Sequence, residues 1–418
     1  MKGDSVYRKS NWLIILGLAV WFLRAADPVP HWRALNQEAR TALQAKDYAA
    51  AREKLLQLKP LMPGNPRIAY ALAAAEARIG NRTAALAGLR NLGAMGLSFD
   101  LPAEESFAAL RDTAEFKAAV QQIEESKKPA TRASLAFTLA ERDLIPEDIA
   151  YDPQTRRFFV SSVRKGKILT VDGTQFAKTD WSVFALRVDA SRRLLWATTA
   201  WIEHCESCLA SDEGKSALLA FDLNSGTLKR RVESPVKGVL GDLTVSKKGD
   251  VYVSEGLHGA LFRLAADATA MERLDTPGEL GSPQTPALSA DEKTLFVPDY
   301  LRGLAAMDVA SHAIRWMEPA DNIAVNGIDG LYLYGDSIIA VQNGTAPPRL
   351  IRFSKDLRQQ EVLEANWTGL GDPTHGVIVG NQLYFIANSG WGDYDDKGKK
   401  KPGSAPVEST IRNLTLGR

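Results

Sequence analysis

The chain contains a distinctive phrase, Pro146-Glu-Asp-Ile-Ala-Tyr-Asp-Pro153, followed after a tight turn by Arg157-Phe-Phe-Val-Ser-Ser162. A carboxylate opens a strand of mainly apolar residues, and a second apolar strand follows the turn. Short apolar strands joined by a tight turn are typical of a β-hairpin. The same phrase recurs five more times before the end of the chain, so the hairpin is the unit of a repeat.

The six copies begin at Glu147, Phe184, Gly241, Gln284, Asp329 and His375. They lie roughly 37 to 57 residues apart, which is about the length of one four-stranded propeller blade. A propeller has to close its ring, because an open blade would expose an unpaired strand edge. The last blade lacks a fourth strand, and we expect residues 133–139 to supply it. The sequence therefore predicts a mainly β, six-bladed β-propeller over residues 133–418.

Residues 32–126 have a helical period instead and are rich in Ala, Leu, Arg and Glu. Lys46–Leu56 and Gly80–Arg90 match at an offset of 34 residues, and this helical-hairpin period resembles the tetratricopeptide repeat. The resemblance implies an N-terminal α-helical domain, joined to the propeller by a linker at 127–132, that binds a protein or peptide partner. The alternative is a helical packing module with no ligand.

The first residues look like a targeting segment. Basic residues precede the apolar run Trp12–Leu23, which is too short for a typical membrane span. We expect residues 1–26 to be a signal peptide or an uncleaved N-terminal anchor, and the protein to be periplasmic or secreted. The formal charge of the chain is only +1, which argues against nucleic-acid binding. Membrane contact is expected only through the possible anchor.

The residue that begins the innermost strand of each blade should point towards the central channel. Glu147-Asp148-Ile and Asp329-Gly330-Leu resemble the corresponding strands of the superfamily that contains gluconolactonase, senescence marker protein, paraoxonase and strictosidine synthase. Hydrolases of that superfamily hold a divalent ion, often calcium, in the channel. The resemblance implies that Glu147 and Asp329 are metal ligands here, since hard cations prefer carboxylate and amide oxygens.

The middle blades depart from the pattern of that superfamily. Gly241 and Gln284 stand where asparagines are expected, so Gln284 is the third candidate ligand, and Asp242 can replace the missing side chain of Gly241 only by bending inwards. His375 is the candidate general base, and Asp148 is a second candidate catalytic group.

Each of these positions also has a purely structural interpretation. Glu147 and Asp148 can cap a turn, Asp329-Gly330 is a common turn dipeptide, and His375 can be a hydrogen-bonded core residue.

The loops after the second strand of each blade should return to the same face of the propeller as the channel opening. The two cysteines of the chain, Cys205 and Cys208, lie in one of these loops, where a disulfide is favoured over free thiols or a metal site. The candidate substrate-binding residues in these loops are Trp201, Asn388, Trp391 and Tyr394.

Two functions follow from these patterns. The first is an exported, divalent-metal-dependent hydrolase of lactones or esters, with a small-molecule substrate in the channel. The second is a non-catalytic binding or scaffold protein that uses the helical repeats and the face of the propeller, because propellers host unrelated functions. A condensing activity like that of strictosidine synthase also fits the predicted fold.

Overall fold

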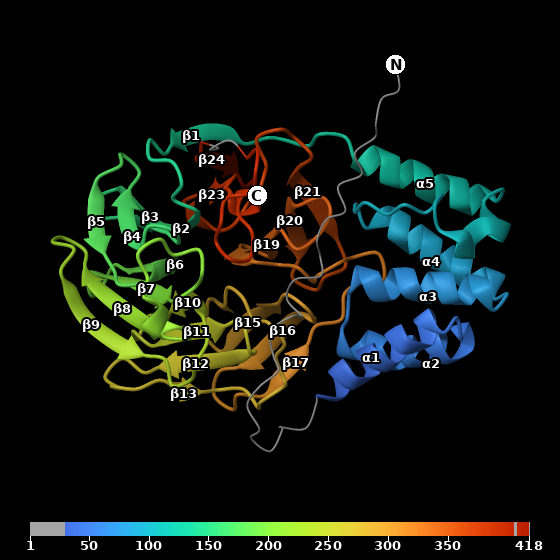
Figure 1. Cartoon of the computed structure of the whole chain (residues 1–418), viewed down its shortest axis with the longest axis horizontal. Coiled ribbons are helices and arrows are strands. Elements are labelled where there is room, and N and C mark those ends of the chain that lie inside the picture. Colours follow the sequence, from blue (N-terminus) through green and yellow to red (C-terminus); the bar gives the residue numbers. More distant parts are fainter. Residues whose placement is uncertain (1–29, 405–407, 418) are drawn as a thin grey trace.

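A computed structural model describes residues 30–404 and 408–417 of the 418-residue chain. The predicted signal peptide or anchor, residues 1–26, lies outside the described residues. Within the described part of the chain, no helix is both long enough and apolar enough to cross a membrane. The chain forms a ring of β-sheets with a group of helices packed against one side (Figure 1). This arrangement confirms the predicted fold class, a six-bladed β-propeller preceded by helices.

The helices precede all of the strands. They are α1 (His31–Gln44), α2 (Tyr48–Leu58), α3 (Pro66–Arg78), α4 (Arg82–Ala94) and α5 (Ala114–Ser126), with short 3₁₀ turns η1 (Lys59–Leu61) and η2 (Glu105–Leu110) between them. The 34-residue repeat has a clear local cause. Asp47 and Asn81 occupy equivalent positions, and each side chain accepts a hydrogen bond from the third residue after it, which caps α2 and α4. The two matched segments therefore begin the second helix of successive hairpins.

Six four-stranded antiparallel sheets form the blades, each with its innermost strand first in the sequence except where the ring closes. The first three blades are β2–β5 (Pro146–Asp152, Arg157–Ser162, Lys167–Thr170, Gln175–Lys178), β6–β9 (Ser182–Asp189, Leu194–Ala200, Ser216–Asp222, Leu228–Glu233) and β10–β13 (Leu240–Val245, Val251–Glu255, Ala260–Leu264, Glu272–Arg273). The next two are β14–β17 (Ala287–Leu288, Thr294–Asp299, Gly303–Asp308, Ile314–Trp316) and β18–β21 (Gly330–Tyr334, Ser337–Gln342, Arg349–Ser354, Gln360–Ala365).

The last blade joins both ends of the propeller sequence. It contains β22 (Gly376–Val379), β23 (Gln382–Ile386), β24 (Thr410–Thr415) and, at its outer edge, β1 (Ser134–Thr138). β1 pairs antiparallel with β24, from Ser134 opposite Asn413 to Thr138 opposite Thr410. A strand that precedes the first blade thus covers the open edge of the last one, which ties the two ends of the ring together.

The innermost strands of the first three blades share an irregularity near the channel. Each has a register shift where it meets its second strand, between residues 146 and 149, 183 and 186, and 240 and 243. In the first and third blades, the backbone N–H of Asp148 and of Asp242 donates to a hydroxyl of the second strand, Ser161 or Ser254. Bulges of this kind redirect side chains at the start of a strand, and here they adjoin the channel.

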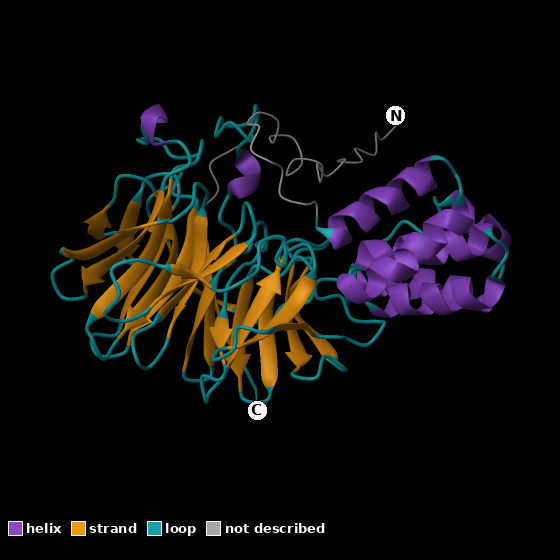
Figure 2. Cartoon of the chain, turned by 90° about the horizontal axis from the view of Figure 1, so that it is seen from below, coloured by secondary structure: helices purple, strands orange, loops and turns teal. Residues whose placement is uncertain are grey.

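Two buried arginines of the propeller hold the helices in place. Arg302 donates through Nε and Nη2 to the carbonyl of Leu61, at 3.0 and 2.8 Å. Arg349 donates through Nη1 to the carbonyls of Met95 and Gly96, just after α4, at 2.8 and 3.1 Å. A cation at the end of a helix satisfies carbonyls that have no partner within the helix and complements its dipole. These contacts join the helical region to the ring, and Figure 2 shows the helices beside the propeller from a second direction.

Candidate metal centre

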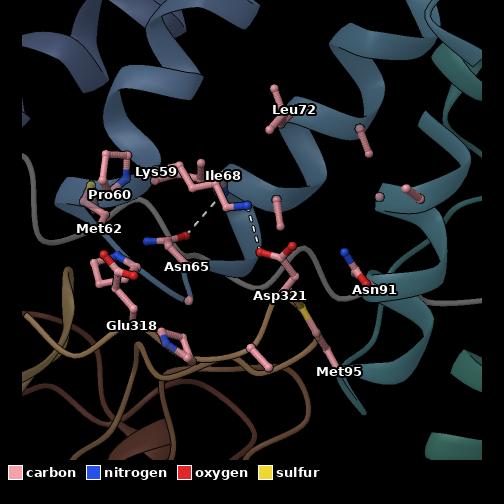
Figure 3. A pocket seen from close by; sticks show the side chains of 18 of the residues that line it. Lys59, Pro60, Met62, Asn65, Ile68, Leu72, Asn91, Met95, Glu318 and Asp321 are labelled. Carbon is pink, nitrogen blue, oxygen red and sulfur yellow. Dashed lines mark hydrogen bonds and ion pairs between the residues drawn. The ribbon is translucent and has the colours of Figure 1, made fainter. Parts of the chain in front are cut away.

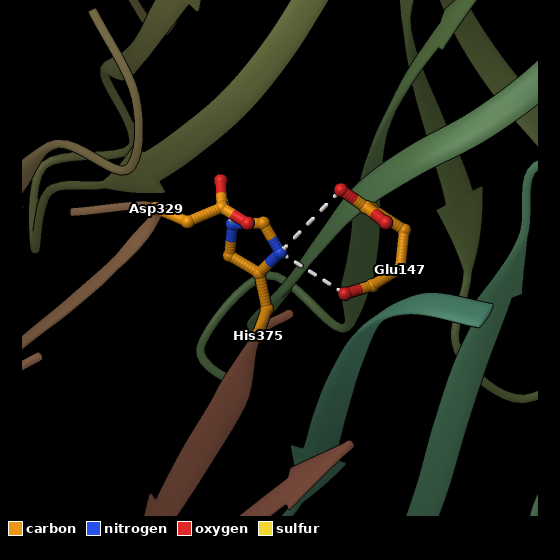
Figure 4. Close-up of side chains that lie close together, drawn as sticks. All are labelled: Glu147, Asp329 and His375. Carbon is orange, nitrogen blue, oxygen red and sulfur yellow. Dashed lines mark hydrogen bonds and ion pairs between the residues drawn. The ribbon is translucent and has the colours of Figure 1, made fainter. Parts of the chain in front are cut away.

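Four side chains from four different blades meet in the channel. Glu147 lies on β2 and Asp242 on β10, while Asp329 and His375 immediately precede β18 and β22. The Nε2 atom of His375 lies 2.9 Å from Asp242 Oδ1 and 3.6 Å from Asp329 Oδ1. Its Nδ1 atom lies 3.9 Å from Glu147 Oε1. Figure 4 shows His375 between Glu147 and Asp329. We call Glu147, Asp242, Asp329 and His375 the channel cluster.

The orientation of His375 is set by the backbone. Its Nδ1 atom lies 3.0 Å from the carbonyl oxygen of Glu147, so this nitrogen carries a proton and donates it. The other nitrogen, Nε2, is thereby directed at the carboxylates of Asp242 and Asp329. Burial alone lowers the pKa of His375, but these two carboxylates outweigh burial and hold the pKa well above its ordinary value. In the absence of a metal ion, His375 is an imidazolium.

The carboxylates of the cluster are poorly hydrated and close to one another. The side chains of Glu147 and Asp329 are 13% and 10% exposed, and that of His375 only 2%. Burial, reinforced by the charge of Asp329, raises the pKa of Glu147 to about 8. Burial also raises the pKa of Asp329 to about 6, against the attraction of His375. Both carboxyls hold protons more tightly than usual because burial removes water from their charged forms and neighbouring carboxylates repel them, which outweighs the attraction of His375.

Two donors orient these carboxylates. The indole N–H of Trp391 donates to Glu147 Oε2 at 2.6 Å, and the amide of Asn343 donates to Asp329 Oδ2 at the same distance. The hydroxyl of Tyr300 in turn donates to Asn343 Oδ1 at 3.1 Å. Each carboxylate therefore has one oxygen fixed by a hydrogen bond, in the manner of supported metal ligands.

The next layer of the channel adds one carboxylate and one guanidinium. Asp148 is fully buried, and its Oδ2 atom accepts from Arg187 Nη1 at 2.9 Å and from the backbone N–H of Leu186 at 2.8 Å. When all four carboxylates of the channel are ionised, one guanidinium and one imidazolium leave two negative charges without a counter-charge, which is why the protein without a cation retains the proton of Glu147. One divalent cation would balance these two charges.

The donor set suits a divalent cation. Glu147, Asp329 and His375 each offer a ligand atom within 4.8 Å of the other two. In the cluster, the buried Nε2 atom of His375 lacks a well-aligned hydrogen bond, and the buried hydroxyls of Thr285 and of Thr374, which precedes His375 in the sequence, have no hydrogen-bond partner either. Thr285 adjoins the cluster because its backbone N–H donates to the carbonyl of Asp329. Carboxylate oxygens suit calcium, magnesium and manganese, and an imidazole nitrogen adds affinity for manganese and zinc.

Other predicted site residues lie outside the channel cluster. The amide nitrogen of Gln284 donates to the hydroxyl and the carbonyl oxygen of Ser282, which keeps it within its own loop. Asp148 is engaged with Arg187, as described above, and none of its hydrogen bonds is to the cluster. The structure therefore brings together Glu147, Asp329 and His375, and adds Asp242.

The loops over the channel form an apolar wall. Trp391, on the short turn η4 (Trp391–Asp393), packs with Phe184 and with Tyr394, whose hydroxyl donates to Asp143 at 2.9 Å. The ring of His204 lies against Trp391, with centroids 4.9 Å apart. Phe184, one of the six positions expected to face the channel, thus contributes to this wall.

The remaining loop residues are placed differently. Cys205 and Cys208 form a disulfide next to His204, before the short turn η3 (Ala210–Asp212). Trp201 packs against the core shared by the first two blades. Asn388 lies against Gly371, where a Cβ atom would come within 2.6 Å of Asn388 Oδ1. The wall over the channel therefore contains Trp391 and Tyr394 from the predicted set.

Sequence reasoning missed Asn343, Tyr300 and Arg187 as parts of the site. Asn343 precedes a glycine directly after β19, and an Asn-Gly pair there looks like an ordinary turn. Arg187 lies within β6, where its partner in the neighbouring blade cannot be read from local sequence. The sequence suggested Asp242 only as a residue that could replace the missing side chain of Gly241 by bending inwards.

Comparisons with known proteins extend only to the fold. No protein-family model and no curated protein matches the chain, so neither the gluconolactonase superfamily nor tetratricopeptide repeats are identified by sequence. Similar solved structures include virginiamycin B lyase from Staphylococcus aureus, at 15% identity over 61% of this chain and 82% of that one, with a TM-score of 0.43. A nidogen/laminin complex matches at 12% identity over 52% and 80%, with a TM-score of 0.41. A Bacteroides caccae protein of unknown function matches at 12% identity over 53% and 83%, also with a TM-score of 0.41.

Proposed function

We propose that the channel cluster binds one divalent cation and that the protein is a cation-dependent hydrolase of small esters or lactones. The observation that carries the proposal is the convergence of Glu147, Asp329 and His375, whose ligand atoms lie within 4.8 Å of one another in a buried site with excess negative charge. Buried charge of one sign is costly unless a counter-ion balances it, and clusters of strongly shifted pKa values are typical of functional sites.

The roles of the residues follow from their contacts. Glu147 and Asp329 would hold the cation, each steadied by its donor, Trp391 or Asn343. When bound, the cation would polarise the carbonyl group of a substrate and so favour the attack of water at the carbonyl carbon. His375 holds or releases a proton at Nε2, because its Nδ1 proton is committed to the backbone. Once a cation offsets the charge of Asp329, neutral His375 would take a proton from the attacking water at Nε2. Asp242 would stabilise the imidazolium that forms, which would then give this proton to the leaving oxygen of the ester or lactone.

Three of the four side chains in the cluster are carboxylates, and calcium is therefore the first cation to test. The apolar wall of Phe184 and Trp391 supports an ester or lactone with an apolar portion, since such a wall would pack against it.

We also propose that the chain is exported. The Cys205–Cys208 disulfide supports this, because disulfides persist in oxidising compartments outside the cytosol. Fractionation of cells that make the full chain, with mass spectrometry of its N-terminus, tests the proposal. Recovery in the cytosol with intact residues 1–26 and reduced cysteines would contradict it.

The hydrolase is tested with protein that has been stripped by EDTA and then supplied with calcium, magnesium or manganese. Hydrolysis of a panel of aryl esters and γ- and δ-lactones should require one of the cations. It should be lost in Asp329→Asn and Asp242→Asn, and kept in Asp336→Asn, which changes an exposed aspartate in the β18–β19 turn. Cation binding without turnover of any ester or lactone would contradict the hydrolase and leave a cation-dependent binding protein.

A further inference from the structure

A cavity of about 460 Å³ lies between the helices and the propeller, apart from the channel. Figure 3 shows it between α3, α4 and the loop that follows β17. Residues from η1 and its following loop close one side, and residues 318–321 of the propeller close another. Its volume is that of a small-molecule site. None of the four residues of the channel cluster lines it.

The walls of the cavity are apolar but its charges are mainly negative. Apolar side chains of the helices cover much of its surface, among them Ile68, Ala69, Leu72, Ala73 and Ala87. The ionisable groups that line it are three carboxylates, Glu76, Glu318 and Asp321, and one ammonium, Lys59.

Lys59 and Asp321 neutralise each other across the opening through a 2.8 Å ion pair between the helical region and the propeller (Figure 3). Glu318 has no ion pair or hydrogen bond among the described residues and is exposed. Because Glu76 is paired with Arg52 and Asp321 with Lys59, Glu318 leaves the cavity with one uncompensated negative charge.

Glu76 supplies the feature that points to a ligand. The residue is only 4% exposed, although it lies on α3 in the wall of the cavity. Its Oε1 atom forms a hydrogen-bonded ion pair with Arg52 Nε at 2.7 Å, which compensates the charge of the carboxylate but satisfies only one of its oxygens. Its Oε2 atom is buried and has no hydrogen-bond partner. A buried carboxylate oxygen without a donor is costly, so a site that contains one favours a ligand that brings the donor.

We propose that this cavity binds a small organic monocation with an apolar body. A primary ammonium group donates to Glu76 Oε2, where it replaces the missing donor with a charge-assisted hydrogen bond. The apolar body packs against Ile68 and Leu72, which removes apolar surface from water. Because both parts of the chain line the cavity, the ligand also bridges the helical region and the propeller.

Calorimetric titration of the full chain with 2-phenylethylammonium, n-hexylammonium and the neutral 2-phenylethanol tests the proposal. We expect at least one ammonium ion to bind, and the alcohol to bind at least tenfold more weakly than 2-phenylethylammonium. Glu76→Gln should weaken ammonium binding by about tenfold to hundredfold, the usual effect of removing a hydrogen bond to a charged group. The matched control is Glu38→Gln, which changes a half-exposed helical carboxylate paired with Lys54.

Ala87→Leu is a second variant that keeps the test decisive if Glu76→Gln does not fold. It fills the cavity without changing its charge and should also abolish binding. Failure of both ammonium ions to bind at millimolar concentration would overturn the proposal. Equal affinity for the alcohol and the ammonium ion, or unchanged binding in either cavity variant, would overturn it as well.

Discussion

Glu147→Gln should make the metal-free protein more stable at alkaline pH. The pKa of Glu147 is raised from 4.5 to about 8 in the native state, so the native state holds this proton more tightly than the unfolded chain does. The stability that comes from the proton is complete below about pH 4.5 and is lost as the pH rises to about 8. At pH 9 the ionised side chain then costs about 3 to 5 kcal/mol of unfolding free energy.

Glutamine has the shape of the protonated carboxyl and cannot ionise. Its amide oxygen can still accept the hydrogen bond from Trp391. In EDTA at pH 5, we therefore expect the variant and the wild type to have similar unfolding free energies. In EDTA at pH 9, the unfolding free energy of the variant should be higher by about 3 kcal/mol or more. In millimolar calcium at pH 8 the order should reverse, because only the wild type retains the full set of ligands.

Urea unfolding at pH 5, 7 and 9, with and without calcium, measures both effects. Glu408→Gln is the control, since Glu408 is an exposed glutamate paired with Arg142 at 3.1 Å. If the unfolding free energies of the wild type and Glu147→Gln depended on pH in the same way in EDTA, Glu147 would titrate alike in the folded and unfolded states, and burial would not raise its pKa.

Three further predictions concern the support of the site and of the fold. Asn343→Ala removes the 2.6 Å hydrogen bond to Asp329 and should weaken cation binding by about tenfold in a calorimetric titration, whereas unchanged affinity would deny the amide its orienting role. Trp391→Phe removes a donor that lowers the pKa of Glu147, so the midpoint of cation binding should move to higher pH; a shift to lower pH would contradict this. Arg349→Met leaves the carbonyls of Met95 and Gly96 without their donor and should lower the unfolding free energy by about 2 to 4 kcal/mol. The helices should also be cleaved faster by a protease. Unchanged stability would show that the contact is dispensable.

The fold was accessible from the sequence because its signals are local. Each hairpin combines apolar strands with turn residues, and six copies at blade-like spacing leave few alternatives to a propeller. β1 was recognisable because a strand without a neighbour in the first blade and a blade short of one strand complement each other. The N-terminal caps Asp47 and Asn81 likewise explain why the 34-residue repeat is visible.

The site was only partly accessible, because its geometry depends on irregularities that local sequence does not show. The register shift between Leu240 and Leu243 places Asp242, and not Gly241, beside His375. A shift of one residue exchanges the two faces of a strand, and no hydrophobic pattern marks it. Arg187, which pairs with Asp148 of the preceding blade, depends on contacts between blades. The resemblance to a metal-binding family pointed to Glu147 and Asp329 but could not supply the rest of the cluster.

An anomalous difference map from crystals grown with manganese would locate the divalent cation that we propose for the channel cluster. We expect one strong peak per chain in the channel, about 2.0 to 2.6 Å from carboxylate oxygens of Glu147 and Asp329. A channel without an anomalous peak at a saturating concentration of manganese, with the cluster otherwise ordered, would show that the cluster does not hold a divalent cation.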